Sequence, residues 1–206
     1  MVIELAIVIR FLCLGDSYTI GESVSAAERW PAQLAAALRT RGLDVADPVI
    51  IARTGWTTDE LDAAIDESDP KSPFDIVTLL IGVNNQYRGR SAEEYREQFR
   101  GLLARAIGFA GGRANRVIVL SIPDWGVTPF AGDRDRTKIG REIDQFNRIN
   151  KEETRRAGAR YVDITPISRE AAGNPALTAG DGLHPSGEMY RRWVGAVEPV
   201  AAGAVK

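Results

Sequence analysis

The chain alternates between short runs of apolar, β-branched residues and longer segments with the periodicity of amphipathic helices. Strands are predicted at residues 3–14, 49–52, 76–81, 117–121 and 161–164. Helices are predicted at residues 26–41, 58–67, 91–109 and 135–157, and a last one after Pro185. The strand segments are almost continuously apolar, as is typical when both faces of a sheet are buried. The alternation therefore predicts an α/β fold, a three-layer α/β/α sandwich around a five-stranded parallel sheet.

Length and composition are those of an ordinary globular protein. With 206 residues, of which 44% are hydrophobic and 26% charged, we expect a single domain over residues 1–206. The formal net charge of −2 gives no electrostatic reason to expect nucleic acid or an anionic membrane as a partner. Cys13 is the only cysteine, which excludes an intrachain disulfide and a cysteine-based metal cluster.

The first fourteen residues are apolar enough to suggest a secretory signal. They lack a basic start, however, and Glu4 and Arg10 interrupt the hydrophobic stretch. Cleavage after them would also remove the strand that leads into Ser17. We interpret the segment as a strand of the mature domain and expect a cytoplasmic protein without an integral membrane segment.

Four short blocks follow predicted strand ends or lie near the end of the chain. They contain Ser17 in Gly-Asp-Ser, Gly55, Asn84 in Gly-Val-Asn, and Asp181 three residues before His184. In open parallel sheets, ligands bind beyond the carboxyl ends of the strands. Each block alone also has an ordinary explanation as a turn, a helix cap or a surface histidine.

The residue types in these blocks suit nucleophilic catalysis. A serine nucleophile needs a base to take its proton and a carboxylate to orient that base. His184 is the only histidine, and the spacing lets Asp181 accept a hydrogen bond from its Nδ1–H. A backbone N–H at Gly55 and the amide of Asn84 are suitable donors to a developing negative charge.

Together, the blocks resemble the SGNH (GDSL-type) hydrolase family, and the resemblance extends from Leu14 to Pro185. It implies a flavodoxin-like doubly wound fold and hydrolysis of carboxylic esters through an acyl-enzyme, without a cofactor. The implied nucleophile is Ser17, the base and later acid is His184, and its orienting carboxylate is Asp181. The implied oxyanion hole consists of the Ser17 and Gly55 backbone N–H groups and the Asn84 side chain.

Three positions qualify the resemblance. The third block usually ends in aspartate, whereas this chain has Asn85, and we expect changed hydrogen bonding there without loss of catalysis. Asp16 is interpreted as part of the Gly-Asp-Ser turn. Asp163, at the end of the fifth predicted strand, is the other carboxylate that could orient the histidine, and the fixed spacing to His184 favours Asp181.

The family suggests a small-molecule ester as substrate, either a short acyl ester or an acetylated sugar. Trp125 and Phe130, in the irregular segment 122–132, either line that site or cover the core. Trp56 and Tyr87 are similar candidates. The spacing of the carboxylates and the single histidine predict no metal site.

Two alternatives stay open at this point. An acyltransferase uses the same catalytic residues with an alcohol in place of water. A flavodoxin-like binding protein would hold a phosphate ligand at the same edge of the sheet, but this leaves the pairing of Asp181 with His184 unexplained. The oligomeric state is likewise left open.

Overall fold

A computed structural model of the protein describes residues 8–205. It contains a sheet of five parallel strands in the order β2-β1-β3-β4-β5. The strands are β1 (Phe11–Asp16), β2 (Val49–Arg53), β3 (Ile76–Leu80), β4 (Val117–Leu120) and β5 (Arg160–Val162). The predicted doubly wound α/β sandwich is confirmed, since the chain crosses over on both sides of β1 and helices cover both faces.

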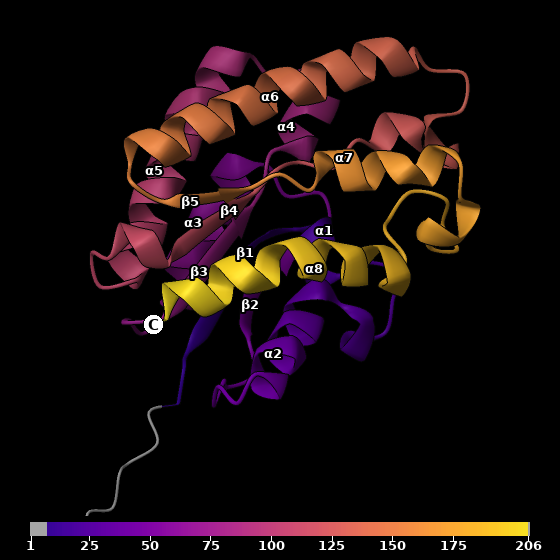
Figure 1. Cartoon of the computed structure of the whole chain (residues 1–206). Coiled ribbons are helices and arrows are strands. Elements are labelled where there is room, and N and C mark those ends of the chain that lie inside the picture. Colours follow the sequence, from indigo (N-terminus) through magenta and orange to yellow (C-terminus); the bar gives the residue numbers. More distant parts are fainter. Residues whose placement is uncertain (1–7, 206) are drawn as a thin grey trace, which may run out of the picture.

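Helices cover the sheet in two layers (Figure 1). α2 (Trp30–Thr40) and α8 (Gly187–Ala204) pack against each other on one face. α3 (Thr58–Ser68), α5 (Ala92–Phe109) and α6 (Arg136–Arg156) form the layer on the other face. Three short helices, α1 (Ser17–Ile20), α4 (Val83–Tyr87) and α7 (Thr165–Ser168), begin within three residues of the ends of β1, β3 and β5. The chain therefore turns back into a helix at the sheet edge where the chemical residues were predicted.

Two element boundaries differ from the sequence prediction for identifiable reasons. The single helix expected at residues 26–41 is wrong, because the extended backbone of Arg29 separates a 3-10 turn (Ala26–Glu28) from α2. Pro31 lies in the first turn of α2, the position in a helix that tolerates proline best. β5 ends earlier than expected, because the backbone N–H groups of Ile164 and Thr165 donate to the Ser121 hydroxyl.

The first strand differs as well. Part of the strand predicted at residues 3–14 lies outside the described residues. Within the described part, Ile9 forms an isolated parallel bridge with Val45, and β1 then runs two residues further than expected, to Asp16. Every residue of β1 is buried.

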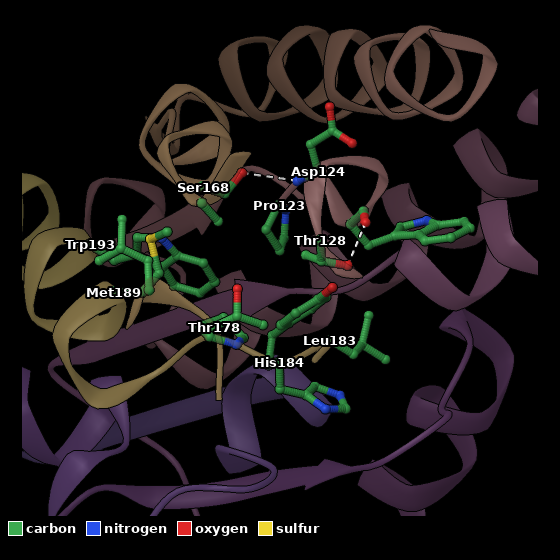
Figure 2. A pocket seen from close by; sticks show the side chains of 14 residues that line it. Pro123, Asp124, Thr128, Ser168, Thr178, Leu183, His184, Met189 and Trp193 are labelled. Carbon is green, nitrogen blue, oxygen red and sulfur yellow. Dashed lines mark hydrogen bonds between the residues drawn. The ribbon is translucent and has the colours of Figure 1, made fainter. Parts of the chain in front are cut away.

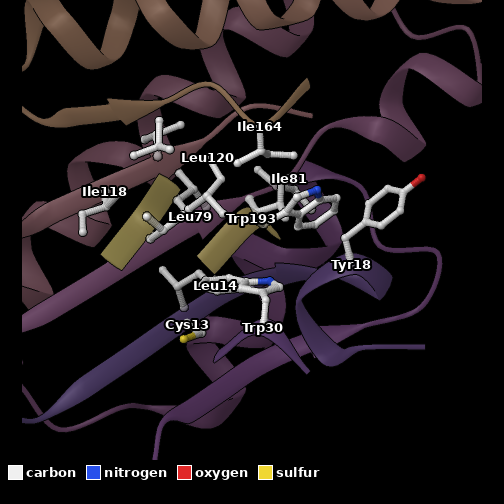
Figure 3. Packing of buried hydrophobic residues seen from close by; sticks show 14 of the residues in the cluster. Cys13, Leu14, Tyr18, Trp30, Leu79, Ile81, Ile118, Leu120, Ile164 and Trp193 are labelled. Atoms are coloured by element: carbon white, nitrogen blue, oxygen red, sulfur yellow. The ribbon is translucent and has the colours of Figure 1, made fainter. Parts of the chain in front are cut away.

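Large aromatic side chains fill the layer between the sheet and the pair α2 and α8. Trp30 of α2 and Trp193 of α8 have no exposed surface and gather with Leu14, Leu79 and Leu120 of the central strands (Figure 3). Fully burying one of these leucine side chains stabilises a fold by about 1.5–3 kcal/mol. This packing holds β1, and with it the turn that follows, in a fixed position.

Candidate active site

Ser17 lies at the first position of α1, directly after β1. The Asp16 carboxylate caps this helix by accepting the Tyr18 N–H at 3.0 Å. Gly15 makes the turn possible, because a Cβ there would lie 2.2 Å from Thr19 Oγ1 and 2.5 Å from the Leu80 carbonyl oxygen. The sharp strand-to-helix turn leaves the Ser17 backbone N–H without a partner inside the helix.

Asp181 and His184 are brought together as their spacing predicts. The Asp181 Oδ2 atom lies 2.6 Å from His184 Nδ1, and Oδ1 accepts the backbone N–H groups of Leu183 and His184 at 2.9 Å each. Partial burial raises the pKa of Asp181, but the hydrogen bonds of Ser23, His184 and these backbone groups outweigh it and hold the pKa well below its usual range. An ionised carboxylate only accepts, so the proton of this hydrogen bond belongs to Nδ1 of His184.

The imidazole is itself almost enclosed. His184 is 7% exposed and contacts the Tyr18 ring edge-on, with 5.7 Å between ring centroids. Because Tyr18 follows Ser17 directly, this contact brings the histidine to the turn that holds the serine. With Nδ1 bound to Asp181, the Nε2 atom is the one left for proton transfer.

Helix α4 and its C-cap residue, Arg88, contact residues 55–58 through three side chains. The Asn84 amide donates to the Trp56 carbonyl at 2.9 Å, and Arg88 Nη2 donates to the Gly55 carbonyl at 2.7 Å. Asn85 is completely buried, accepts the Thr58 N–H at 3.1 Å and donates to Thr58 Oγ1 at 2.7 Å. Gly82 allows the chain to enter α4 with a φ of +124°, where a Cβ would lie 2.4 Å from the Tyr95 hydroxyl. Asn84 and Asn85 thus both bind residues 55–58, and Asn85 is the more deeply buried of the two.

Most of the predicted residues line one cavity of about 160 Å³. Ser17, Gly55, Asn84 and His184 border it together with Tyr18 and with a cluster of three further aromatic side chains, those of Tyr87, Trp125 and Phe130. The three aromatic rings contact one another, with centroids 5.4–6.3 Å apart.

The remaining candidates lie outside this cavity or at its border. Trp56 does not line it and instead packs, partly buried, against the core. The sequence left open whether Trp125 lines the substrate site or covers the core, and it does both. It is 4% exposed, belongs to the core and lines the cavity. Asp163 lies in a separate polar depression with α6 and α7 and accepts a hydrogen bond from Ser121 Oγ.

A smaller space of about 20 Å³ adjoins the first and shares His184, Trp125, Tyr18 and Leu183 with it (Figure 2). In this space, the Asp124 N–H donates to Ser168 Oγ of α7 at 2.9 Å. The Asp124 carboxylate, which is 5% exposed, binds Arg169 at 2.9 Å. These contacts fix the segment that holds Trp125 against the body of the protein.

Asp16 is a titratable group whose character the sequence did not indicate. It is 1% exposed, and burial raises its pKa from 3.8 to about 7, against the opposing effect of the Tyr18 N–H. Its Oδ2 atom has no hydrogen-bond partner among residues 8–205. The sequence shows only that Asp16 lies next to Ser17. It does not show that Asp16 is buried, because burial depends on how the whole fold packs.

Within the described range 8–205, no three histidine, cysteine, aspartate or glutamate side chains come together in a way that could hold a metal ion. No helix in the same range is both long and apolar enough to cross a membrane.

Solved structures of other proteins share the fold of this chain. The chain is similar in fold to a member of the lipolytic G-D-S-L family from Veillonella parvula, with a TM-score of 0.72, 19% identity, and 93% of this chain and 97% of that chain covered. It is also similar to a lipase/acylhydrolase from Enterococcus faecalis, with a TM-score of 0.70, 20% identity, and 96% and 97% covered. An acetylxylan esterase from Geobacillus stearothermophilus gives a TM-score of 0.67 at 19% identity, with 98% and 96% covered.

A search of curated proteins finds no match. The model of the GDSL-like lipase/acylhydrolase family matches residues 13–192, which include Ser17, Gly55, Asn84, Asp181 and His184. The chain therefore belongs to the GDSL-like lipase/acylhydrolase family and is a carboxylic ester hydrolase.

Proposed function

We propose that the protein hydrolyses esters through an acyl-enzyme on Ser17, with His184 as base and Asp181 as its orienting carboxylate. The observation that carries the proposal is the 2.6 Å contact between Asp181 Oδ2 and His184 Nδ1, on an imidazole that lines the same cavity as Ser17. Nε2 of His184 takes the hydroxyl proton as Ser17 Oγ attacks the ester carbonyl, and then gives it to the leaving alcohol. A water molecule then attacks the acyl-enzyme carbonyl while His184 takes its proton. His184 returns this proton to Ser17 Oγ as the acid leaves, which regenerates the enzyme.

The negative charge of each tetrahedral intermediate needs donors that converge on one point. We assign this role to the backbone N–H groups of Ser17 and Gly55 and to the Asn84 amide. One Asn84 N–H already donates to the Trp56 carbonyl, so the amide plane is fixed and its second N–H remains for the oxyanion. Such preorganised donors cost no reorganisation when the charge develops.

Short acyl esters and acetylated sugars are the proposed substrates. The cavity of about 160 Å³ is smaller than the roughly 300–1,000 Å³ of sites for drug-sized ligands. Trp125 is buried and held by its indole N–H, which donates to Gln86 Oε1 at 2.8 Å, so it sets a firm limit on the acyl group. Tyr87 and Phe130 are 50% and 38% exposed and offer aromatic faces to the alcohol part of the ester.

Initial rates on p-nitrophenyl esters of graded acyl length and on acetylated sugars test this proposal. We expect kcat/KM to be highest for acetyl and other short acyl groups and to fall steeply as the chain lengthens. Ser17→Ala, measured in parallel, should lose essentially all turnover on every substrate. A preference for long acyl chains would contradict the substrate assignment. Product analysis with alcohols added in competition with water should yield free acid as the main product.

A further inference from the structure

The Asp181 carboxylate has a fourth donor, which belongs to a distant part of the chain. Ser23 Oγ lies 2.6 Å from Oδ2, the same oxygen that contacts His184 Nδ1. Two backbone N–H groups bind Oδ1. A carboxylate has about four lone-pair positions, so Ser23 fills the last of them.

Ser23 lies in the loop of residues 21–25, between α1 and the 3-10 turn Ala26–Glu28. Its φ of +65° lies in the left-handed region, which residues other than glycine seldom adopt. Ser23 is exposed, so the side chain packs against little that would explain a serine at this position. Backbone conformations of this kind are concentrated at functional sites.

The same loop also contacts the segment that carries Gly55, one of the proposed oxyanion donors. The Thr54 hydroxyl, one residue before Gly55, donates to the Glu22 carboxylate. The N–H groups of Gly21 and Glu22 both donate to the Ser17 carbonyl. The loop therefore connects the segments that hold Ser17, Gly55 and the Asp181 carboxylate.

We propose that Ser23 is a positioning residue that fixes the Asp181 carboxylate, so that Oδ2 stays aligned with Nδ1 of His184. The inference rests on the proposed function of the triad. Asp181 is 31% exposed, and without the hydroxyl its carboxylate can rotate and exchange His184 for water. The imidazole then spends less time in the orientation and tautomer that accept the Ser17 proton.

Ser23→Gly tests the proposal best, because glycine accepts the positive φ while the hydroxyl is removed. We expect kcat to fall by about tenfold with little change in KM, and the thermal midpoint to stay equal or rise. Ser25→Gly is the matched control, since Ser25 lies two residues away and, within the described part of the chain, its side chain binds only Glu28. Its kcat should remain within twofold of the wild-type value.

A second readout does not depend on turnover. His184 is the only histidine, so a downfield proton NMR signal of a hydrogen-bonded Nδ1–H is assigned without ambiguity. In Ser23→Gly this signal should broaden through faster exchange with water, while in Ser25→Gly and Ser17→Ala it should persist.

Two results would overturn the role of Ser23: an unchanged kcat with an unchanged signal, or a fall in kcat that follows a loss of stability. If Ser17→Ala kept its activity, the proposed function would fail instead, and the NMR comparison would still decide whether Ser23 holds the carboxylate.

Discussion

Asp16 lies beside the proposed nucleophile and should make the stability of the fold depend on pH near neutrality. Asp16 is 1% exposed, and among residues 8–205 the only donor to its carboxyl group, besides its own backbone, is the Tyr18 N–H. Burial raises its pKa from 3.8 to about 7. Between these values the folded protein keeps a proton that the unfolded chain has lost.

The sign and size of the effect follow from linkage. A group with a raised pKa contributes stability that is fully present below pH 3.8 and is lost as the pH rises through about 7. A shift of about three pH units corresponds to a loss of about 4 kcal/mol in the free energy of unfolding. In Asp16→Asn the amide oxygen can still accept the Tyr18 N–H, and the side chain does not titrate.

Urea unfolding of the wild type and Asp16→Asn at pH 4, 6 and 8 measures this difference. We expect the variant to gain up to about 4 kcal/mol relative to the wild type between pH 4 and pH 8, most of it above pH 5. Asp163→Asn, which changes an exposed aspartate, should follow the wild type throughout. Parallel stability curves for the wild type and Asp16→Asn would refute the argument.

Other predictions concern the oxyanion donors, the base and metals. Asn84→Ala should lower kcat by ~10²–10³ with KM nearly unchanged, because the amide acts mainly on the transition state. Asn85→Asp should keep substantial activity, since it retains the oxygen that accepts the Thr58 N–H; a greater loss of kcat than in Asn84→Ala would reverse the assignment. His184→Ala should lose both turnover and the acidic limb of the kcat/KM profile, and unchanged turnover would exclude the triad. Dialysis against EDTA should leave kcat unchanged, and recovery on adding a divalent ion after a loss would contradict metal-independent catalysis.

Features that depend on local spacing could be predicted from the sequence. The apolar runs indicated the five strands, and the three-residue spacing of Asp181 and His184 anticipated their contact. The order of the blocks, each after a strand end, placed Ser17, Gly55 and Asn84 at one sheet edge, where they line one cavity.

Features that depend on long-range packing could not be predicted. Asp16 is 1% exposed although it lies at the very end of β1, and Trp56 packs against the core although its neighbour Gly55 lines the cavity. The contact of Ser23 with Asp181 joins residues 158 positions apart. Helix α4 is only five residues long, too short to show helical periodicity, yet it places both Asn84 and Asn85 against the Gly55 loop.

Covalent labelling with a fluorophosphonate, followed by peptide mass spectrometry, tests the central claim most directly. The reagent reacts with a serine only when a base activates the hydroxyl and donors stabilise the phosphonyl oxygen. We predict one label per chain, on the peptide that contains Ser17, with no label in Ser17→Ala and a greatly slowed reaction in His184→Ala. A label on another serine, or equal labelling rates in the wild type and His184→Ala, would contradict the assignment of Ser17 and His184 as nucleophile and base.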